Sequence, residues 1–260
     1  MVSYEVRDAV AVITLMRAPM NALSIPFLDE ILAALRGAAA DDAVRAVVLR
    51  SGLEQAFSAG LDLDLLLGRS REDVRAVLQR LYIDLADVQY AMGKTTIAAV
   101  GGAARGGGMT LATSCNVILA SDQATFGYPE IKLGLVPAIH FAHLPPIVGR
   151  HRAYELLFSG RVFDAAKAAE LGLVSGVVSA SELDRAAMDL ATTFARQSPS
   201  AMRAGRAAFM RTNDFRDAIR QAVDDFCDVA ATPDAQEGMK AFLDKRPPRW
   251  GRIPPEPESA

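Results

Sequence analysis

Four runs rich in valine, isoleucine and leucine, separated by helical patterns, constrain the fold of this chain more than any other feature. Between the first two runs, Leu28, Ile31 and Leu35 recur at helical spacing after Ser24, which fits a helix N-cap. Short β-rich runs that alternate with helices predict a layered α/β core, although the recurrence is too loose to be a strict sequence repeat. The runs are AVAVITLM (9–16), AVRAVVLRS (43–51), TTIAAVGG (95–102) and NVILAS (116–121).

Composition excludes several classes of protein. The 260 residues are 51% apolar and 23% charged, which is typical of a globular chain that buries a large core. The net charge is −3 and no basic block is interleaved with aromatics, so nothing favours nucleic-acid binding. The N-terminus lacks the pattern of a secretory signal, and the most apolar stretch (133–149) contains three prolines and two histidines. These features predict a cytoplasmic protein that does not span a membrane.

The two cysteines and the C-terminal third complete the outline. Cys115 and Cys227 lack metal-ligand spacing, so we expect reduced thiols and no metal site. Beyond residue 181 the patterns are helical only. We therefore expect a core over residues 1–195 and a helical segment over 196–260 that ends in a proline-rich tail. The helices could serve oligomerisation or could fold back on their own core.

Glycines mark the first candidate site. Gly106, Gly107 and Gly108 precede an expected helix, where free backbone N–H groups and the helix dipole favour an anionic oxygen. The same glycines could simply make a tight strand-to-helix connection. The stretch FSAGLDL (57–63) could supply a second N–H donor, as an oxyanion hole requires, or could be a turn capped by Asp62.

A carboxylate follows the glycines along the chain. Glu130 comes after Pro129 and precedes Ile131 and Leu133. In an apolar pocket, desolvation would raise its pKa toward the range that is useful for proton transfer, whereas on an open loop it would be an ordinary solvated side chain.

In combination, these motifs resemble the crotonase superfamily, also called the enoyl-CoA hydratase/isomerase family. The resemblance is collinear over nearly the whole chain. It implies a spiral of ββα turns, a helical C-terminal segment that builds trimers or hexamers, and acyl-CoA thioester substrates with no separate cofactor. The motifs are NAL (21–23), FSAGLDL (57–63), IAAVGGAARGGGMTLATSCNVILAS (97–121), FGYPEIKLGLVP (126–137), LLFSGRVFDAAKAAELGLVSGVV (156–178) and EGMKAFLDKR (237–246).

The resemblance also implies roles for individual residues. The amides of Leu61 and Gly107 would hold the thioester oxygen as it becomes an enolate, and Glu130 would be the catalytic carboxylate. Thr110, Pro137 and His140 would line the substrate pocket. CoA would be bound by Ala59, Asp62, Phe226 and Lys245, the last two from a neighbouring subunit; Lys245 could equally be a solvated lysine at a helix end.

One departure from the family pattern bears on the reaction. Hydratases of this family carry a second glutamate where this chain has Thr110, and a hydroxyl cannot act as the base that activates water. The isomerases of the family resemble this chain here, because they keep one glutamate and an uncharged residue at the other position. The resemblance therefore implies that Glu130 shuttles a proton from C2 to C4 and converts a 3-enoyl-CoA into a 2-enoyl-CoA.

Other functions remain open from the sequence. A hydratase or dehydratase could use Glu130 and a water held by a histidine, a CoA-thioester hydrolase is chemically close, and a noncatalytic acyl-CoA-binding role is a further class. The stretch AIHFAHLPP (138–146) replaces the glycine-rich run of the hydratases and carries His140 and His143. These histidines could transfer protons or could be packed structural residues. Arg105 could contact a CoA phosphate or cap the glycine loop.

Overall fold

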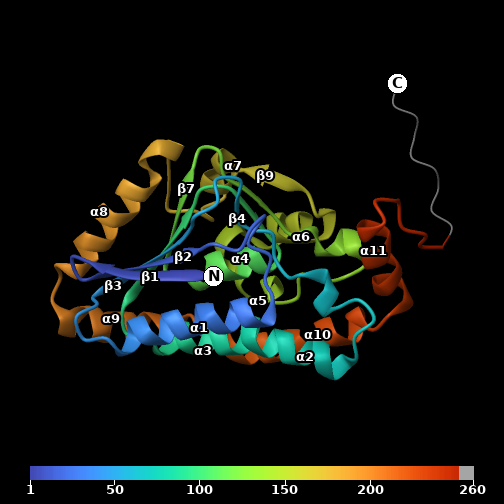
Figure 1. Cartoon of the computed structure of the whole chain (residues 1–260), viewed down its shortest axis with the longest axis horizontal. Helices are drawn as coiled ribbons and strands as arrows, with labels where there is room; N and C mark the ends of the chain where they lie inside the picture. The colour runs from blue at the N-terminus through green and yellow to red at the C-terminus, as the bar shows by residue number, and fades with distance from the viewer. Residues whose placement is uncertain (252–260) are drawn as a thin grey trace.

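The computed structural model describes residues 1–251, and Figure 1 shows the arrangement of its elements. The strands are β1 (Val2–Arg7), β2 (Val10–Leu15), β3 (Ala46–Ser51), β4 (Ala56–Ser58), β5 (Thr95–Val100), β6 (Ala103–Arg105), β7 (Val117–Ser121), β8 (Thr125–Gly127), β9 (Val162–Asp164) and β10 (Gly176–Val178). The α-helices are α1 (Ile25–Ala40), α2 (Arg71–Leu78), α3 (Leu85–Ala91), α4 (Gly107–Ser114), α5 (His140–Val148), α6 (Arg150–Ser159), α7 (Ala165–Glu170), α8 (Leu183–Ala195), α9 (Pro199–Thr212), α10 (Arg216–Ala230) and α11 (Pro233–Leu243). Short 3-10 helices are η1 (Leu63–Leu65), η3 (Pro129–Leu133) and η4 (Ala180–Glu182), and η2 (Gln79–Asp84) is a π-helical turn.

Two sheets form the centre of the molecule. The larger has the strand order β1-β2-β3-β5-β7-β10 and the smaller has the order β4-β6-β8-β9. The pairs β3–β4, β5–β6 and β7–β8 each place their first strand in the larger sheet and their second in the smaller, parallel to the strands of the neighbouring pair. Helical segments follow each pair. This is a spiral of ββα turns, and the predicted α/β fold is confirmed.

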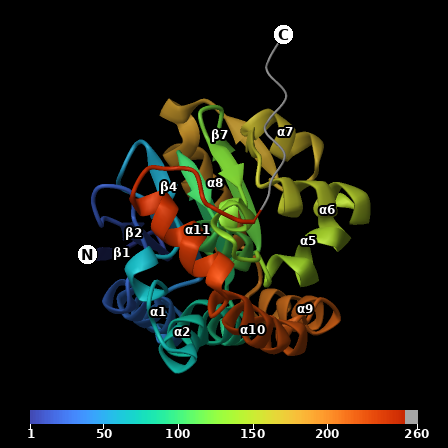
Figure 2. The ribbon, with the colours of Figure 1, turned by 90° about the vertical axis from the view of Figure 1, so that its right-hand side faces the viewer.

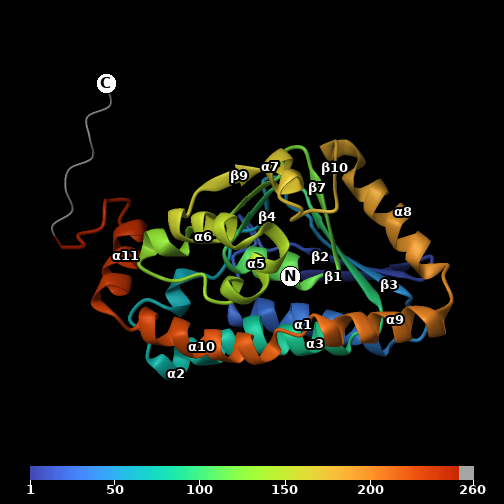
Figure 3. The ribbon, with the colours of Figure 1, turned by 180° about the vertical axis from the view of Figure 1, so that it is seen from behind.

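The four apolar runs form β2, β3, β5 and β7, which lie side by side in the larger sheet. Both faces of these strands are covered, which explains continuous apolar runs rather than alternation with polar residues. In β2, Val10 and Val12 pack in the cluster that includes α8, whereas Ile13 faces the main core. Figure 3 shows α8 lying along the outer face of this sheet.

A layer of helices covers the other face. Ser24 caps α1 as predicted, because its hydroxyl accepts a hydrogen bond from the Phe27 N–H at 3.4 Å. In Figure 1, α1, α3, α2 and α10 run along the bottom of the molecule, and α10 contacts α2 and η2. None of the helices in the described part of the chain is long and apolar enough to cross a membrane.

The C-terminal helices fold back on their own chain. Val223 and Phe226 of α10 belong to the main hydrophobic core, and α11 packs on η3 at the end of the molecule seen in Figure 2. The predicted boundary between residues 195 and 196 coincides with the end of α8, before α9 begins at Pro199. Residues 252–260 of the predicted proline-rich tail lie outside the described residues.

Candidate active site

Two backbone amides face one another at the start of α4. Gly106 has a φ of +48° and leads into the helix, while Gly60, with a φ of +91°, precedes Leu61. A Cβ atom at Gly107 would lie 3.4 Å from the Leu61 nitrogen, and one at Gly60 would lie 3.1 Å from the Gly107 nitrogen. Within residues 1–251, neither the Leu61 nor the Gly107 N–H donates to a protein acceptor. Two adjacent free donors at a helix N-terminus suit an oxygen that gains negative charge.

Close packing holds these amides in place. A Cβ atom at Gly108 would lie only 2.3 Å from the Ser58 carbonyl oxygen, so only glycine allows α4 to approach β4 this closely. The Ser58 hydroxyl donates to the Asn21 carbonyl at 2.8 Å, and the Asn21 side-chain amide donates to the Phe57 carbonyl at 3.0 Å. The NAL and FSAG motifs are therefore structural partners that fix the loop carrying Leu61.

Glu130 brings a buried carboxyl group to the same place. It lies on η3, is only 9% exposed, and its Oε2 has no hydrogen-bond partner among the described residues. A Cβ atom at Gly106 would lie 2.9 Å from Oε1, so the carboxyl group packs directly on the residue before α4. Burial raises the pKa of Glu130 from 4.5 to about 7, and its own backbone N–H only partly opposes this. The group can therefore both accept and donate a proton near neutral pH.

Thr110 of α4 is the first of three neighbouring polar side chains, followed by His140 and His143. Its hydroxyl lies 3.5 Å from Nε2 of His140, whose Nδ1 lies 3.0 Å from Nε2 of His143. The His140 ring packs against Tyr128 with the ring centres 4.5 Å apart. Burial lowers the pKa of both histidines, that of His143 to about 4, so both rings are neutral at pH 7. The two departures from the hydratase pattern are therefore in contact with each other.

A cavity of about 630 Å³ opens onto the free amides and the carboxyl group. We call it the thioester groove, after the substrate class that the family resemblance implies. Three cationic side chains lie along it, and one of these, Arg246, is paired with Glu237 at 2.6 Å. The lining residues used below are Ala59, Leu61, Asp62, Tyr82, Arg105, Gly107, Glu130, Lys132, Phe226 and Arg246.

Comparison with known proteins decides the family. The family model described as enoyl-CoA hydratase/isomerase matches residues 5–253. The chain belongs to the enoyl-CoA hydratase/isomerase family. It is therefore an acyl-CoA enzyme.

Relatives of this family resemble the chain over almost its whole length. A probable enoyl-CoA hydratase of Mycobacterium bovis is 36% identical over 246 residues, which cover 93% of this chain and 94% of the relative. A probable enoyl-CoA hydratase of Bacillus subtilis is 33% identical, with 96% and 98% covered. The crystal structure of an enoyl-CoA hydratase from Mycobacterium avium subsp. paratuberculosis superposes with a TM-score of 0.86 at 26% identity, covering 96% of this chain and 98% of that one.

Most of the residues that the family resemblance assigns lie together. Leu61, Gly107 and Glu130 meet in the thioester groove, which Ala59, Asp62 and Phe226 also line. Asp62 additionally caps η1, because its carboxylate accepts from the Asp64 N–H at 3.4 Å.

Other assigned residues lie elsewhere. Thr110 lines a second cavity of about 350 Å³ rather than the groove, and His143 lines the same cavity. Pro137, His140 and Lys245 line neither cavity. The Arg105 guanidinium donates to the Thr125 carbonyl and hydroxyl at 2.7 Å each, and in this way joins β6 to β8 as a loop anchor.

Phe226 is expected to reach the CoA of a neighbouring subunit, but in this chain it is buried. It is 2% exposed and packs edge-on against Tyr82 of its own chain, with the ring centres 6.3 Å apart. In this chain it is therefore a wall of its own groove. A role at a neighbouring subunit's CoA stays a prediction.

Sequence reasoning missed several residues of the groove, among them Tyr82, Lys132 and Arg246. Lys132 follows Glu130 by two positions in the recognised FGYPEIKLG motif, which could have indicated it. Tyr82 had no such signal, because it lies on a π-helical turn and falls within none of the motifs. Among residues 1–251, no cluster of three or more histidine, cysteine or acidic side chains could hold a metal ion.

Proposed function

We propose that this enzyme moves a carbon–carbon double bond in an enoyl-CoA, from the 3 to the 2 position, with Glu130 as its single acid and base. The observation that carries the proposal is one buried carboxyl group with a pKa of about 7 beside two free backbone amides. Thr110 contacts a neutral imidazole, and the family resemblance matches it to the position where a hydratase has its second glutamate.

The reaction follows from these groups. The amides of Leu61 and Gly107 hold the thioester oxygen while the ionised Glu130 removes a proton from C2. The resulting dienolate spreads its charge from that oxygen to C4, and the protonated Glu130 returns the proton there. Each amide donor contributes roughly 3 kcal/mol of transition-state stabilisation in comparable oxyanion holes. Ketosteroid isomerase offers a known parallel, with one carboxylate base and an oxyanion hole. Neither water nor a cofactor takes part, since CoA belongs to the substrate.

A second candidate, hydration of a 2-enoyl-CoA, is favoured by the names of the relatives, which are hydratases. It would need a group besides Glu130 to position the water, and the Thr110–His140 contact is the nearest polar candidate. Burial of Glu130 beside the free amides counts against a purely acyl-CoA-binding role.

The deciding experiment offers the purified enzyme a trans-3-enoyl-CoA and, separately, a trans-2-enoyl-CoA. We expect conjugation of the 3-enoyl substrate, followed by absorbance, without the mass gain of water. Glu130→Gln should lower kcat by about 10²- to 10⁴-fold, whereas Thr110→Ala, the matched control, should leave most of the activity. Rapid hydration of the 2-enoyl substrate with negligible movement of the 3-enoyl bond would refute isomerisation in favour of hydration.

Assembly is part of the proposal. We infer a homotrimer, alone or paired into a hexamer, because large apolar side chains stay exposed on the C-terminal helices of the single chain. These include Phe209 on α9 and Phe242 on α11, each 62% exposed.

A further inference from the structure

Among residues 1–251, the thioester groove and the second cavity share a single lining residue, Tyr82. The groove contains Gly107 and Glu130, and the second cavity contains Thr110, one turn further along α4. The two cavities therefore lie on either side of a thin partition next to the reacting groups.

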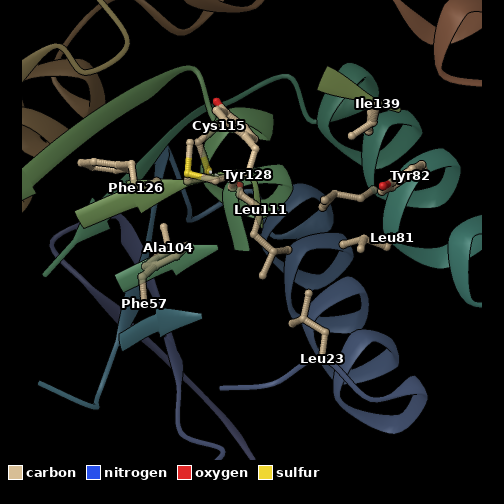
Figure 4. Close-up of a cluster of buried hydrophobic side chains, with 14 of the residues drawn as sticks. Leu23, Phe57, Leu81, Tyr82, Ala104, Leu111, Cys115, Phe126, Tyr128 and Ile139 are labelled. Atoms are coloured by element: carbon tan, nitrogen blue, oxygen red, sulfur yellow. Dashed lines mark hydrogen bonds between the residues drawn. The ribbon is translucent and has the colours of Figure 1, made fainter. Parts of the chain in front are cut away.

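The partition is built from the π-helical turn η2. Leu81 is fully buried and its Cδ2 lies 3.0 Å from the position of a Cβ at Gly107, so it packs directly against the first residue of α4. Tyr82 is 3% exposed and is braced by the edge of Phe226. Figure 4 shows Leu81 and Tyr82 projecting from their helix toward Leu111 of α4, with Ile139 above them. A π-helical turn aims these two side chains differently from a regular helix, and such turns are frequent at functional sites.

The second cavity fits an apolar chain. Its volume of about 350 Å³ falls within the range of small-ligand pockets. Leu85, Ile139 and Ile219 provide aliphatic wall, and Phe209 and Phe215 add aromatic surface. The cation at its rim, Arg216, is already engaged: it pairs with Asp214 at 2.8 Å and stacks on Tyr90 at 3.5 Å. The lining therefore offers burial to hydrocarbon rather than a free charge to an anion.

We infer that the second cavity is a distal acyl compartment and that the ring of Tyr82 is the partition that excludes it, so the enzyme selects short acyl groups. The inference rests on the proposed function only in that an acyl-CoA thioester occupies the groove. An acyl chain whose carbonyl oxygen sits on Leu61 and Gly107 passes Glu130 and meets Tyr82, which lines the groove. Without the ring of Tyr82, the chain continues into the cavity behind it.

The test measures binding of saturated butanoyl-CoA and decanoyl-CoA by calorimetry, so that no double bond has to move. Burial of each additional methylene strengthens binding by roughly fourfold. The wild-type enzyme should bind decanoyl-CoA with little more affinity than butanoyl-CoA. Tyr82→Ala should raise the ratio of decanoyl to butanoyl affinity by about tenfold or more, and Tyr82→Leu serves in its place if the alanine variant does not fold.

Three controls isolate the partition. Tyr82→Phe keeps the ring and should keep the wild-type ratio. Tyr154→Ala removes an exposed ring on α6, outside both cavities, and should also keep it. Ile139→Trp, added to Tyr82→Ala, refills the second cavity and should reverse the gain, which a general loosening of the core would not do.

Each outcome separates the two proposals. An unchanged affinity ratio in folded Tyr82→Ala and Tyr82→Leu overturns the partition. The partition is also overturned if the wild-type enzyme already binds decanoyl-CoA with the full, roughly fourfold increase in affinity for each additional methylene. If the ratio shifts as expected but a 3-enoyl-CoA is not isomerised, the compartment stands and only the proposed reaction fails. If neither thioester binds, both the compartment and the proposed function are refuted.

Discussion

Glu130 combines deep burial with an oxygen that no described group satisfies, and its ionisation should therefore control the reaction. Only the ionised carboxylate can remove a proton from C2. Because burial raises the pKa of Glu130 to about 7, we expect kcat/KM to rise with pH through that value and then level off. Initial rates with a 3-enoyl-CoA, measured from about pH 5 to about pH 9, check this. A profile that is flat across the neutral range would contradict it.

The same burial has a cost in stability. The folded protein holds a proton on Glu130 up to about pH 7, whereas the unfolded chain releases it near 4.5, so stability falls as pH rises between these values. Above pH 7 the ionised group costs on the order of 3 kcal/mol. We expect Glu130→Gln to be more stable than the wild type, with a difference in unfolding free energy that grows from pH 5 to 7. Denaturant titrations measure it, and Glu155→Gln on the exposed surface of α6 should show no such gain.

At the scale of single residues, the sequence predicted which residues lie together where a motif carried the information. Glu130, Leu61 and Gly107 lie in recognisable motifs, and the structure brings them to one groove. The contact of Thr110 with His140 could not be predicted, because it joins positions 30 residues apart and depends on how α5 docks on α4. The position of Tyr82 likewise depends on the extra winding of a π-helical turn, which has no pattern in the sequence.

At the scale of elements, the effect of replacing a helix glycine by alanine depends on what the helix packs against at that position. Gly108 faces the Ser58 carbonyl, whereas nothing lies within 4 Å of a Cβ at Gly37 in α1. Gly108→Ala should therefore destabilise the protein by at least about 2 kcal/mol through overpacking. Gly37→Ala, the matched control, should stabilise it by about 0.5–1 kcal/mol because alanine favours a helix interior. Denaturant unfolding compares the two, and equal effects would contradict the close approach of α4 to β4.

The elements themselves were largely predictable. The apolar runs became neighbouring parallel strands and the C-terminal patterns became α8, α9 and α10, because period and composition determine such regular elements. Helix α5 departs from simple rules, since Pro145 and Pro146 lie inside it. Burial of His140, Leu144 and Val148 along one face supplies tertiary packing that outweighs the unfavourable prolines.

For the whole molecule, exposed apolar surface predicts assembly. Phe209 on α9 and Phe242 and Leu243 on α11 are each at least 47% exposed, and a partner subunit would bury this apolar surface. We expect light scattering after gel filtration to give three or six times the 27.8 kDa mass of the chain. A monomer at micromolar concentration would contradict the trimer.

A buried carboxyl group that titrates near neutrality links ligand occupancy to the acidity of the medium. When a thioester fills the groove, it displaces water and makes the charged form of Glu130 still less favourable. Substrate entry then draws a proton from the surroundings, and product departure gives one back. The apparent affinity of the enzyme should accordingly weaken as the solution becomes alkaline, while the fraction of enzyme ready to react grows, so the two tendencies oppose each other around neutral pH.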